Sequence, residues 1–493
     1  MIDLLKINNL DNVAVAVNSL NAGTKSELIE GGTVKEDIKA GHKVALSNIK
    51  KGEKVIKYGY QIGVANADIK AGEFVHSHNL KSVISGTQNY TYHKITVELT
   101  PKKADTFMGF VRENGDVGCR NEVWIIPTVG CVNPIVKEME KRAQKYIGGS
   151  IDSITAYTHP YGCSQLGDDM ARTLDFLCGL IRHPNAAGVL VVGLGCENGN
   201  IAELKKRLGE YNENRVKFLN CQDFEDEFEK ADNLLKELTD YAKGFTRTVC
   251  NADKLVIGLK CGGSDGFSGL TANALVGSFS DLLISMGGST LLTEVPEMFG
   301  AEHILMDRAT NKDVFLKEVD LINNFKKYFI KYGEKTDENP SPGNKEGGIT
   351  TLAEKSLGCV QKGGSAPVAD VLAYGQKVKE SGLSLVNGPG NDLVATGALV
   401  AAGAQIVLFT TGRGTPFCCP VPTVKISSNT PLYNKKSAWI DFNAGELLNG
   451  KSIEDLTTEF KNLIFDIASG KKAAKSEAFE KNELAIFKDG VTL

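Results

Sequence analysis

Chemically useful side chains recur in this chain where apolar runs end. They are Cys131, Cys163 with His159, Cys196 with Glu197, Cys261 with Ser264 and Asp265, and Glu294 with Glu297. A glycine lies beside each of these thiols, so the backbone can approach a ligand closely and its N–H groups can hold an anion. A single buried cysteine is just as readily a small hydrophobic residue. The repetition of the pattern favours a site for iron or another borderline-soft metal.

Two more histidines, His76 and His78, lie two positions apart in the segment FVHSHN. Residues i and i+2 of a strand project to the same face, so this spacing predicts a pair of metal ligands. An exposed pair on an edge strand is the alternative.

Two glycine-rich turns near the C-terminus carry groups that suit an anionic, hydroxylated ligand. Arg413 lies between glycines in GRGTP, and its planar guanidinium matches a carboxylate. Asn391 and Asp392, in GPGND, are suited to hydroxyl groups. Either turn alone is as readily structural, and neither matches GxGxxG or GxxxxGK[ST]. Dinucleotide binding and nucleotide hydrolysis therefore have no support.

The elements that must position these groups are apolar strands alternating with helices. Runs such as AGVLVVG and AQIVLFTT end at glycine turns and precede helical stretches. This order predicts an α/β fold with mostly parallel, Rossmann-like sheets, whose ligands lie beyond the carboxyl ends of the strands. The polar segment 331–348 reads as a long connection between two such sheets.

The first hundred residues follow another pattern. The unit DIKAG occurs at 37–41 and 68–72, with NIKKG at 48–52 between them. Short units with glycine at the turn predict a small all-β module. We expect the module at 1–100, a linker at 101–106, and an α/β catalytic region in two parts, 107–335 and 336–493.

Composition excludes several classes of partner. The formal net charge of -4 over 493 residues offers no broad basic surface for nucleic acid. We expect no membrane segment, because no stretch approaches about 18 uncharged apolar residues and the N-terminus lacks a cationic leader. Eleven cysteines, an odd number, are better read as reduced thiols. The expected compartment is the cytoplasm.

Longer segments resemble one family. They are FMGFVRENGDVGCRN, HPYGCSQLGDD, GLGCEN, CGGSDGFSGLTAN, TEVPEMFGAEH, NPSPGNKEGGITTLAEKSLGC, GPGNDLVATGA and FTTGRGTP. Together they resemble the altronate and galactarate dehydratase family, and the N-terminal module resembles its SAF-type (β-clip) domain. The resemblance implies a hydro-lyase that acts on a small sugar acid with ferrous iron or manganese. The uninterrupted GCSQLGDD and the chain length favour D-altronate, converted to 2-dehydro-3-deoxy-D-gluconate.

Such a dehydration requires loss of the C2 proton and departure of the C3 hydroxyl, aided by a metal ion. Our first hypothesis gives the metal to His76 and His78, with Glu197 or Glu294, and gives His159 an acid/base role. Substrate binding falls to Arg413, Asn391, Asp392 and Lys345. The rival hypothesis places iron or an iron–sulfur cluster on Cys163, Cys196 and Cys261, which leaves the histidines for proton transfer.

Three alternatives to an altronate dehydratase stay open. They are a galactarate dehydratase, a sulfolactate sulfo-lyase on the same scaffold, and a non-catalytic protein that binds a sugar acid. A homo-oligomer also stays open. All of these readings expect His76, Cys163, Cys196, Cys261 and Arg413 to share one pocket, closed by the N-terminal module.

Overall fold

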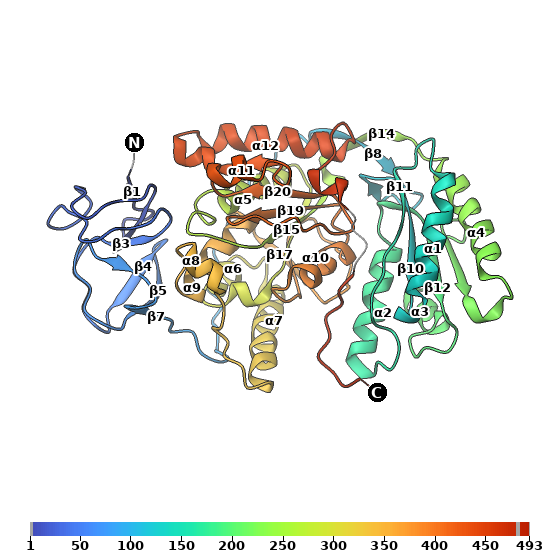
Figure 1. Cartoon of the computed structure of the whole chain (residues 1–493), viewed down its shortest axis with the longest axis horizontal. Coiled ribbons are helices and arrows are strands. Elements are labelled where there is room, and N and C mark those ends of the chain that lie inside the picture. The colour runs from blue at the N-terminus through green and yellow to red at the C-terminus, as the bar shows by residue number, and fades with distance from the viewer. Residues whose placement is uncertain (1–2, 480–483, 493) are drawn as a thin grey trace.

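The structure is a computed structural model that describes residues 3–479 and 484–492. Three bodies lie in a row: the N-terminal β module, a central domain around a large parallel sheet, and a second domain around a smaller one (Figure 1). The predicted α/β class, with a small β module ahead of a large parallel-sheet region, is confirmed.

The N-terminal module consists of two small antiparallel sheets. The first contains β1 (Leu4–Leu5), β2 (Val13–Ala16), β3 (Lys43–Ala45) and β6 (Phe74–Val75); the second contains β4 (Lys54–Lys57), β5 (Tyr60–Ala65) and β7 (Leu80–Lys81). The glycines that close the three sequence repeats, Gly41, Gly52 and Gly72, all have φ between 83° and 90°. Only glycine adopts this backbone readily, which explains the repeat.

A segment without helix or strand connects the module to the rest of the chain. It runs from residue 82 to 105, between β7 and β8 (Thr106–Val111). The expected module limit at residue 100 falls within this segment, and the predicted linker at 101–106 reaches the first residue of β8. These domain limits stay predictions. This strap is tied to the central domain, because the hydroxyls of Tyr90 and Tyr92 donate hydrogen bonds to Glu302 (2.6 Å) and the Ala309 carbonyl (2.7 Å).

The second domain is a parallel sheet in the order β11-β10-β12-β13. Its strands are β10 (Glu122–Pro127), β11 (Ser153–Ala156), β12 (Ala186–Gly193) and β13 (Val216–Asn220). Its helices are α1 (Asn133–Ala143), α2 (Gly167–Ile181), α3 (Ile201–Leu208) and α4 (Glu227–Ala242). Apolar residues of α1 and α4 form one core and those of α2 and α3 another, so both faces are covered.

The central domain is built on a seven-stranded parallel sheet in the order β17-β18-β16-β15-β19-β20-β21. The strands are β15 (Val256–Cys261), β16 (Ser289–Leu292), β17 (Val368–Leu372), β18 (Gly382–Val386), β19 (Ile406–Thr411), β20 (Thr423–Ser427) and β21 (Phe442–Asn443). The strand order turns back between β15 and β19. Such a topological switch point opens a crevice for ligands.

Helices and a small antiparallel sheet complete the central domain. The helices are α5 (Ala272–Ser285), α6 (Glu302–Met306), α7 (Lys312–Lys331), α8 (Pro342–Glu346), α9 (Leu352–Cys359), α10 (Asp392–Ala401), α11 (Thr430–Lys435) and α12 (Ile453–Ala468). The sheet pairs β8 with β9 (Val117–Gly118) and β14 (Arg247–Asn251).

The segment 331–348 does not separate two sheets, because β16 and β17, on either side of it, belong to one sheet. That expectation was wrong. None of the helices in the described residues is long and apolar enough to cross a membrane.

Candidate active site

Two adjacent glycines, Gly262 and Gly263, mark the switch point at the end of β15. A Cβ atom on Gly262 would lie 3.1 Å from Oδ1 of Asp392, and one on Gly263 would lie 3.3 Å from Cβ of Arg413. Gly263 is exposed and has a φ of 65°. The predicted substrate-binding residues Asp392 and Arg413 therefore flank one exposed turn, and Asn391 caps the start of α10 beside them.

Arg413 is available to an incoming anion. Its guanidinium forms an ion pair with Glu346 at 2.7 Å, and the two side chains are 43% and 67% exposed. Exposed pairs of this kind contribute about 0–1 kcal/mol, so a substrate carboxylate can replace Glu346 at little cost. Lys345, also exposed, precedes Glu346 in α8.

The N-terminal module brings a histidine pair to the same α8 segment. The antiparallel register of β3 and β6 pairs Lys43 with Val75, and the rings of the adjacent residues His42 and His76 lie 5.4 Å apart. His76 Nδ1 is 2.7 Å from the Thr350 hydroxyl. Burial, followed by the charge of Lys43, lowers the pKa of His76 to about 4. This imidazole is neutral at pH 7.

The strand geometry predicted for His76 and His78 was wrong. Both residues lie in the turn between β6 and β7, where His78 is exposed and its ring lies 5.5 Å from that of Phe74. The partner of His76 is instead His42, which sequence reasoning missed. Its Nε2 lies 3.1 Å from the Glu346 carbonyl, and its Nδ1 is buried without a hydrogen-bond partner in the structure. Only the pairing of β3 with β6 reveals this neighbour.

The module is held against the central domain by a buried ion triad. Glu354 of α9 accepts contacts from Lys43 at 2.9 Å and Lys57 at 2.8 Å, and all three side chains are at most 1% exposed. Burial alone would raise the pKa of Glu354, but the two ammonium groups lower it to about 2. The histidine pair is therefore fixed in place by charge as well as by packing.

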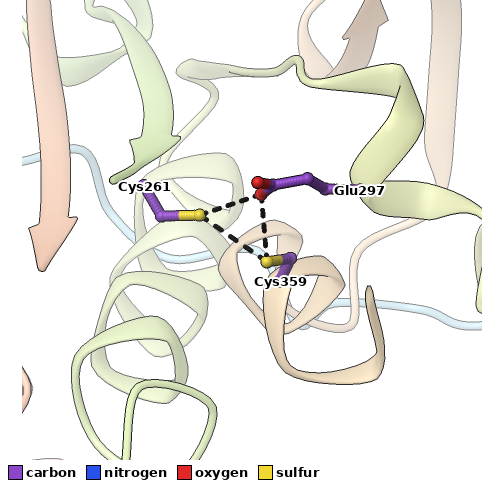
Figure 2. A group of neighbouring side chains, drawn as sticks. All are labelled: Cys261, Glu297 and Cys359. Atoms are coloured by element: carbon purple, nitrogen blue, oxygen red, sulfur yellow. Dashed lines mark hydrogen bonds between the residues drawn. The ribbon is translucent and has the colours of Figure 1, made fainter. Parts of the chain in front are cut away.

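Behind the glycine turn lies a buried group that could hold a metal ion. Cys261, Glu297 and Cys359 each offer one ligand atom within 4.8 Å of the others. Glu297 Oε2 is 3.1 Å from the Cys261 sulfur and 3.2 Å from the Cys359 sulfur, and the two sulfurs are 3.6 Å apart (Figure 2). Sequence reasoning named Cys261 and Glu297, but it missed Cys359 because that thiol lies at the end of a helix. The geometry is compatible with a metal.

Three lysines surround this group. Lys362 is 3.1 Å from the Cys261 sulfur, and Lys355 is 2.7 Å from Glu297. The hydrogen bond with Cys359 outweighs burial and, with the charges of Lys362 and Lys260, lowers the pKa of Cys261 to about 6. A metal ion bound here would replace ammonium contacts that already neutralise the thiolate and the carboxylate.

Lys260 connects the buried group to the exposed turn. Its ammonium contacts Glu294, and it also pairs with Asp392 at 2.9 Å. Glu294 is buried and has a φ of 73°, a strained backbone for any residue other than glycine. Burial and the nearby Cys261 raise the pKa of Glu294 well above its ordinary value. Lys260 thus joins Asp392, at the exposed turn, to the buried carboxyl group of Glu294.

Two predicted residues of the second domain have structural partners that argue against their assigned roles. His159 is 2% exposed; its Nε2 lies 2.8 Å from the Pro127 carbonyl and its Nδ1 accepts the Tyr161 N–H, so neither nitrogen is free for proton transfer. Glu197 is equally engaged, since it accepts hydrogen bonds from the Thr128 hydroxyl and the Gly195 N–H.

The rival site of Cys163, Cys196 and Cys261 does not form as a compact group. Cys163 and Cys196 are exposed at the edge of the smaller sheet, whereas Cys261 is buried in the central domain beside Cys359. Within the described residues, the only group of three such ligand atoms within 4.8 Å of one another is Cys261, Glu297 and Cys359. A single metal ion therefore cannot bridge the three predicted thiols in this arrangement.

A separate cavity is lined by none of these groups. It has a volume of about 570 Å³ and is lined by Arg112, Arg182, Arg215 and Lys377 among others. It lies near Pro184 and Val216, at the amino ends of β12 and β13. Chemistry in this fold is expected at the opposite, carboxyl ends.

The chain has two parallel sheets, and ionisable groups gather at the switch point of the larger one. This arrangement is typical of a multidomain α/β enzyme. Three family profiles match the chain: the altronate/galactarate dehydratase SAF domain at 2–83, the D-galactarate dehydratase/altronate hydrolase second domain at 109–243, and the D-galactarate/altronate dehydratase C-terminal domain at 252–492. The chain belongs to the altronate and galactarate dehydratase family of hydro-lyases.

Curated relatives agree over the full length. The chain is 53% identical to an altronate dehydratase of Bacillus subtilis, over 100% of both chains, and 49% identical to one of Escherichia coli, over 99% of both. It is 33% identical to the galactarate dehydratase (L-threo-forming) of Escherichia coli, over 98% of this chain and 96% of that one. The beta subunit of a (2R)-sulfolactate sulfo-lyase from Chromohalobacter salexigens is 27% identical over 78% of this chain and 97% of the subunit.

Proposed function

We propose that the protein is an altronate dehydratase, which converts D-altronate to 2-dehydro-3-deoxy-D-gluconate. The observation that carries this proposal is full-length identity near 50% to two altronate dehydratases, against 33% to a galactarate dehydratase. The switch-point site supports it, because it offers groups for a carboxylate and for hydroxyls on one exposed turn. Its exposed thiols favour a reducing compartment, the cytoplasm.

In this proposal, Arg413 and Lys345 bind the substrate carboxylate, and Asn391 and Asp392 bind its hydroxyls. Arg413 is free to do so because its partner Glu346 is largely exposed. The Asn391 side-chain oxygen accepts the Val394 N–H, which leaves its NH₂ group for a hydroxyl oxygen. Asp392 is oriented by Lys260.

His76 is the proposed base, with its Nδ1 as proton acceptor once the substrate has taken the place of the Thr350 hydroxyl. Unlike His159, it is only partly buried. Its lowered pKa keeps it neutral at working pH, as a proton acceptor must be. It takes the C2 proton, the C3–O bond breaks, and His76 returns the proton to the departing hydroxide, which leaves as water. The enol product then tautomerises to the 2-keto-3-deoxy acid. His42, beside it, is neutral for the same reason, since burial lowers its pKa.

The proposed cofactor is Fe²⁺ or Mn²⁺, which Cys261, Glu297 and Cys359 would hold. A divalent cation supplies electrostatic stabilisation of negative charge that develops beside a carboxylate. Thiols and carboxyls bind a metal ion only after they lose their protons, so the affinity of this group for a metal should fall at low pH. Lys355 and Lys362 lie against the same ligands.

The test is an assay of the anaerobically purified protein with Fe²⁺ or Mn²⁺ against altronate, galactarate and sulfolactate. We expect 2-keto acid from altronate at a kcat/KM at least about tenfold above that for the other two. Sulfite release would instead identify the sulfo-lyase, and saturable binding without product would identify a binding protein. The His76→Ala variant should lose about 10²-fold or more in kcat, whereas His78→Ala, with its exposed ring, should keep its activity.

A further inference from the structure

Three cysteines lie at one edge of the smaller sheet. Cys131 follows β10, Cys163 follows β11 and Cys196 follows β12, and these three strands are adjacent and parallel. Their loops touch: the Gly130 N–H donates to the Tyr161 carbonyl at 2.8 Å, and the Ser164 N–H donates to the Asn198 side chain at 3.3 Å. The three thiols therefore belong to one continuous surface at the switch point of this sheet.

Exposure separates these thiols from the rest. The structure describes all eleven cysteines of the chain, and the exposed ones are Cys131, Cys163 and Cys196; Cys418 is intermediate and the others are buried. Free cysteine is ordinarily among the most buried residue types. Three exposed thiols on three neighbouring strand ends are not explained by packing.

Each of the three thiols follows a glycine that the local packing requires. A side chain on Gly162 would overlap the Thr128 carbonyl, and one on Gly130 would lie 3.0 Å from the His159 carbonyl. Gly162 and Gly195 have φ values of 97° and 124°. The three loops can thus pack closely against one another at these glycines.

Charge and spacing indicate the kind of ligand. Two of these sulfurs contact neutral groups. The Ser164 hydroxyl lies 3.7 Å from the Cys163 sulfur, and the Gln222 amide lies 3.9 Å from the Cys196 sulfur. In this they differ from Cys261, which has Lys362 at 3.1 Å. The three sulfurs do not all lie within 4.8 Å of one another, so one tetrahedral ion would fit poorly. A polynuclear centre spreads its thiolates over several metal atoms, and the contacts between the three loops keep the thiols on one surface.

The thiol surface opens toward the switch point of the central domain. Gly179 of α2 packs on Ala401 of α10, and Phe176 packs on Gly397, so the two helices run parallel and begin at the same end. The loops before them carry Cys163 and Asn391. In addition, the Tyr157 hydroxyl donates to the Pro420 carbonyl at 3.2 Å, which joins the end of β11 to the loop after β19.

We propose that Cys131, Cys163 and Cys196 bind an iron–sulfur cluster of the [4Fe–4S] class through three thiolates. Three thiolates would leave one iron without a thiolate from the protein, and the loop of Cys163 precedes a helix that packs on the helix after Asn391. This site is separate from the buried group of Cys261, Glu297 and Cys359, and its occupancy does not depend on which sugar acid the enzyme uses.

The test measures iron and acid-labile sulfide in the full-length protein after anaerobic expression and reconstitution with ferrous iron and sulfide. We expect about four sulfides and about four irons per chain, plus about one more iron where the group of Cys261 is also loaded, with the visible absorbance and the electron paramagnetic resonance signal of a cluster after reduction. Cys131→Ser, Cys163→Ser and Cys196→Ser should each lose most of the sulfide or shift the g values of that signal. Cys221→Ser is the matched control, since this buried thiol follows β13 of the same sheet.

Circular dichroism and size-exclusion chromatography of each variant separate loss of the cluster from loss of the fold. Three outcomes overturn the proposal: wild-type protein that binds iron without sulfide, wild-type protein that binds neither, or a cluster that survives unchanged in the three variants. Because the readout needs no substrate, a failed altronate assay leaves this result intact, and the reverse also holds.

Discussion

At the scale of single residues, the environment decided which predicted groups are available for chemistry. Arg413 is exposed with a weak partner, whereas both nitrogens of His159 are occupied by backbone groups. The residue types alone could not separate these cases, because exposure and hydrogen-bond partners depend on contacts far apart in the chain. His42 was missed for the same reason.

Arg413→Ala should lower kcat/KM for altronate about 10- to 100-fold, mainly through a higher KM, because one charge-assisted pair to a carboxylate contributes about 1.5–3 kcal/mol. Arg413→Lys should recover only part, since an ammonium cannot form the bidentate pair. Steady-state kinetics checks this. Arg142→Ala, which removes an exposed pair with Glu138, is the control and should change neither constant. An unchanged KM in Arg413→Ala would remove the carboxylate assignment.

His159 should make stability depend on pH. Burial lowers the pKa of its imidazole to about 4, against an ordinary value of 6.5. The unfolded chain therefore takes up a proton first, so this contribution is complete above pH 6.5 and is lost as the pH falls toward 4. Between pH 6.5 and 4.5 the loss is about 2–3 kcal/mol.

Urea unfolding of wild type and His159→Gln at the two pH values checks this. The variant should lose less free energy of unfolding on acidification than the wild type, by about 2–3 kcal/mol. If the two proteins show equal losses, the buried imidazole is not the group that titrates.

At the scale of elements, the alternation of apolar strands and helices was enough to predict parallel sheets. A site beyond their carboxyl ends stays a prediction. The glycine repeat was likewise enough to predict the β module. The order of the strands in the sheet could not be predicted. For example, β15 pairs with β19, which is far away in the sequence, and no local sequence pattern indicates this pairing. The pairing of β3 with β6, which brings His42 to His76, is a second example.

Gly266 should be essential for the packing of the N-terminal module against the central domain. A Cβ atom at this position would overlap the backbone carbonyl of Gly41, in the turn that precedes β3. Gly266→Ala should therefore shift the module and its histidine pair, and lower kcat about 10²-fold. Gly148→Ala is a matched control, since nothing lies within 4 Å of a Cβ atom there. Equal activity in both variants would contradict the role of the module in the site.

At the scale of the whole molecule, the module and the central domain are held together by the buried triad of Lys43, Lys57 and Glu354. Glu354→Gln leaves two buried ammonium groups without a countercharge and should cost about 3–5 kcal/mol. Glu459→Gln, which breaks an exposed pair with Lys451, should cost under about 1 kcal/mol.

Denaturant unfolding followed by circular dichroism measures both variants, and limited proteolysis of the strap at 82–105 reports whether the module has separated. We expect faster cleavage in Glu354→Gln alone. A stable Glu354→Gln protein with an intact strap would mean that packing, and not charge, holds the module.

The anchoring of the strap limits how far an undocked module can travel. Gln88, just before Tyr90, is tied to Asn323 through its N–H (3.2 Å) and its carbonyl (2.9 Å). The free tether from the end of β7 is therefore at most residues 82–87, which span at most about 22 Å when fully extended. A released module can therefore move only within the reach of this tether, and it cannot dock on another copy of the chain that lies farther away. Exchange of modules between two copies of the chain would first require the tyrosine anchors to detach.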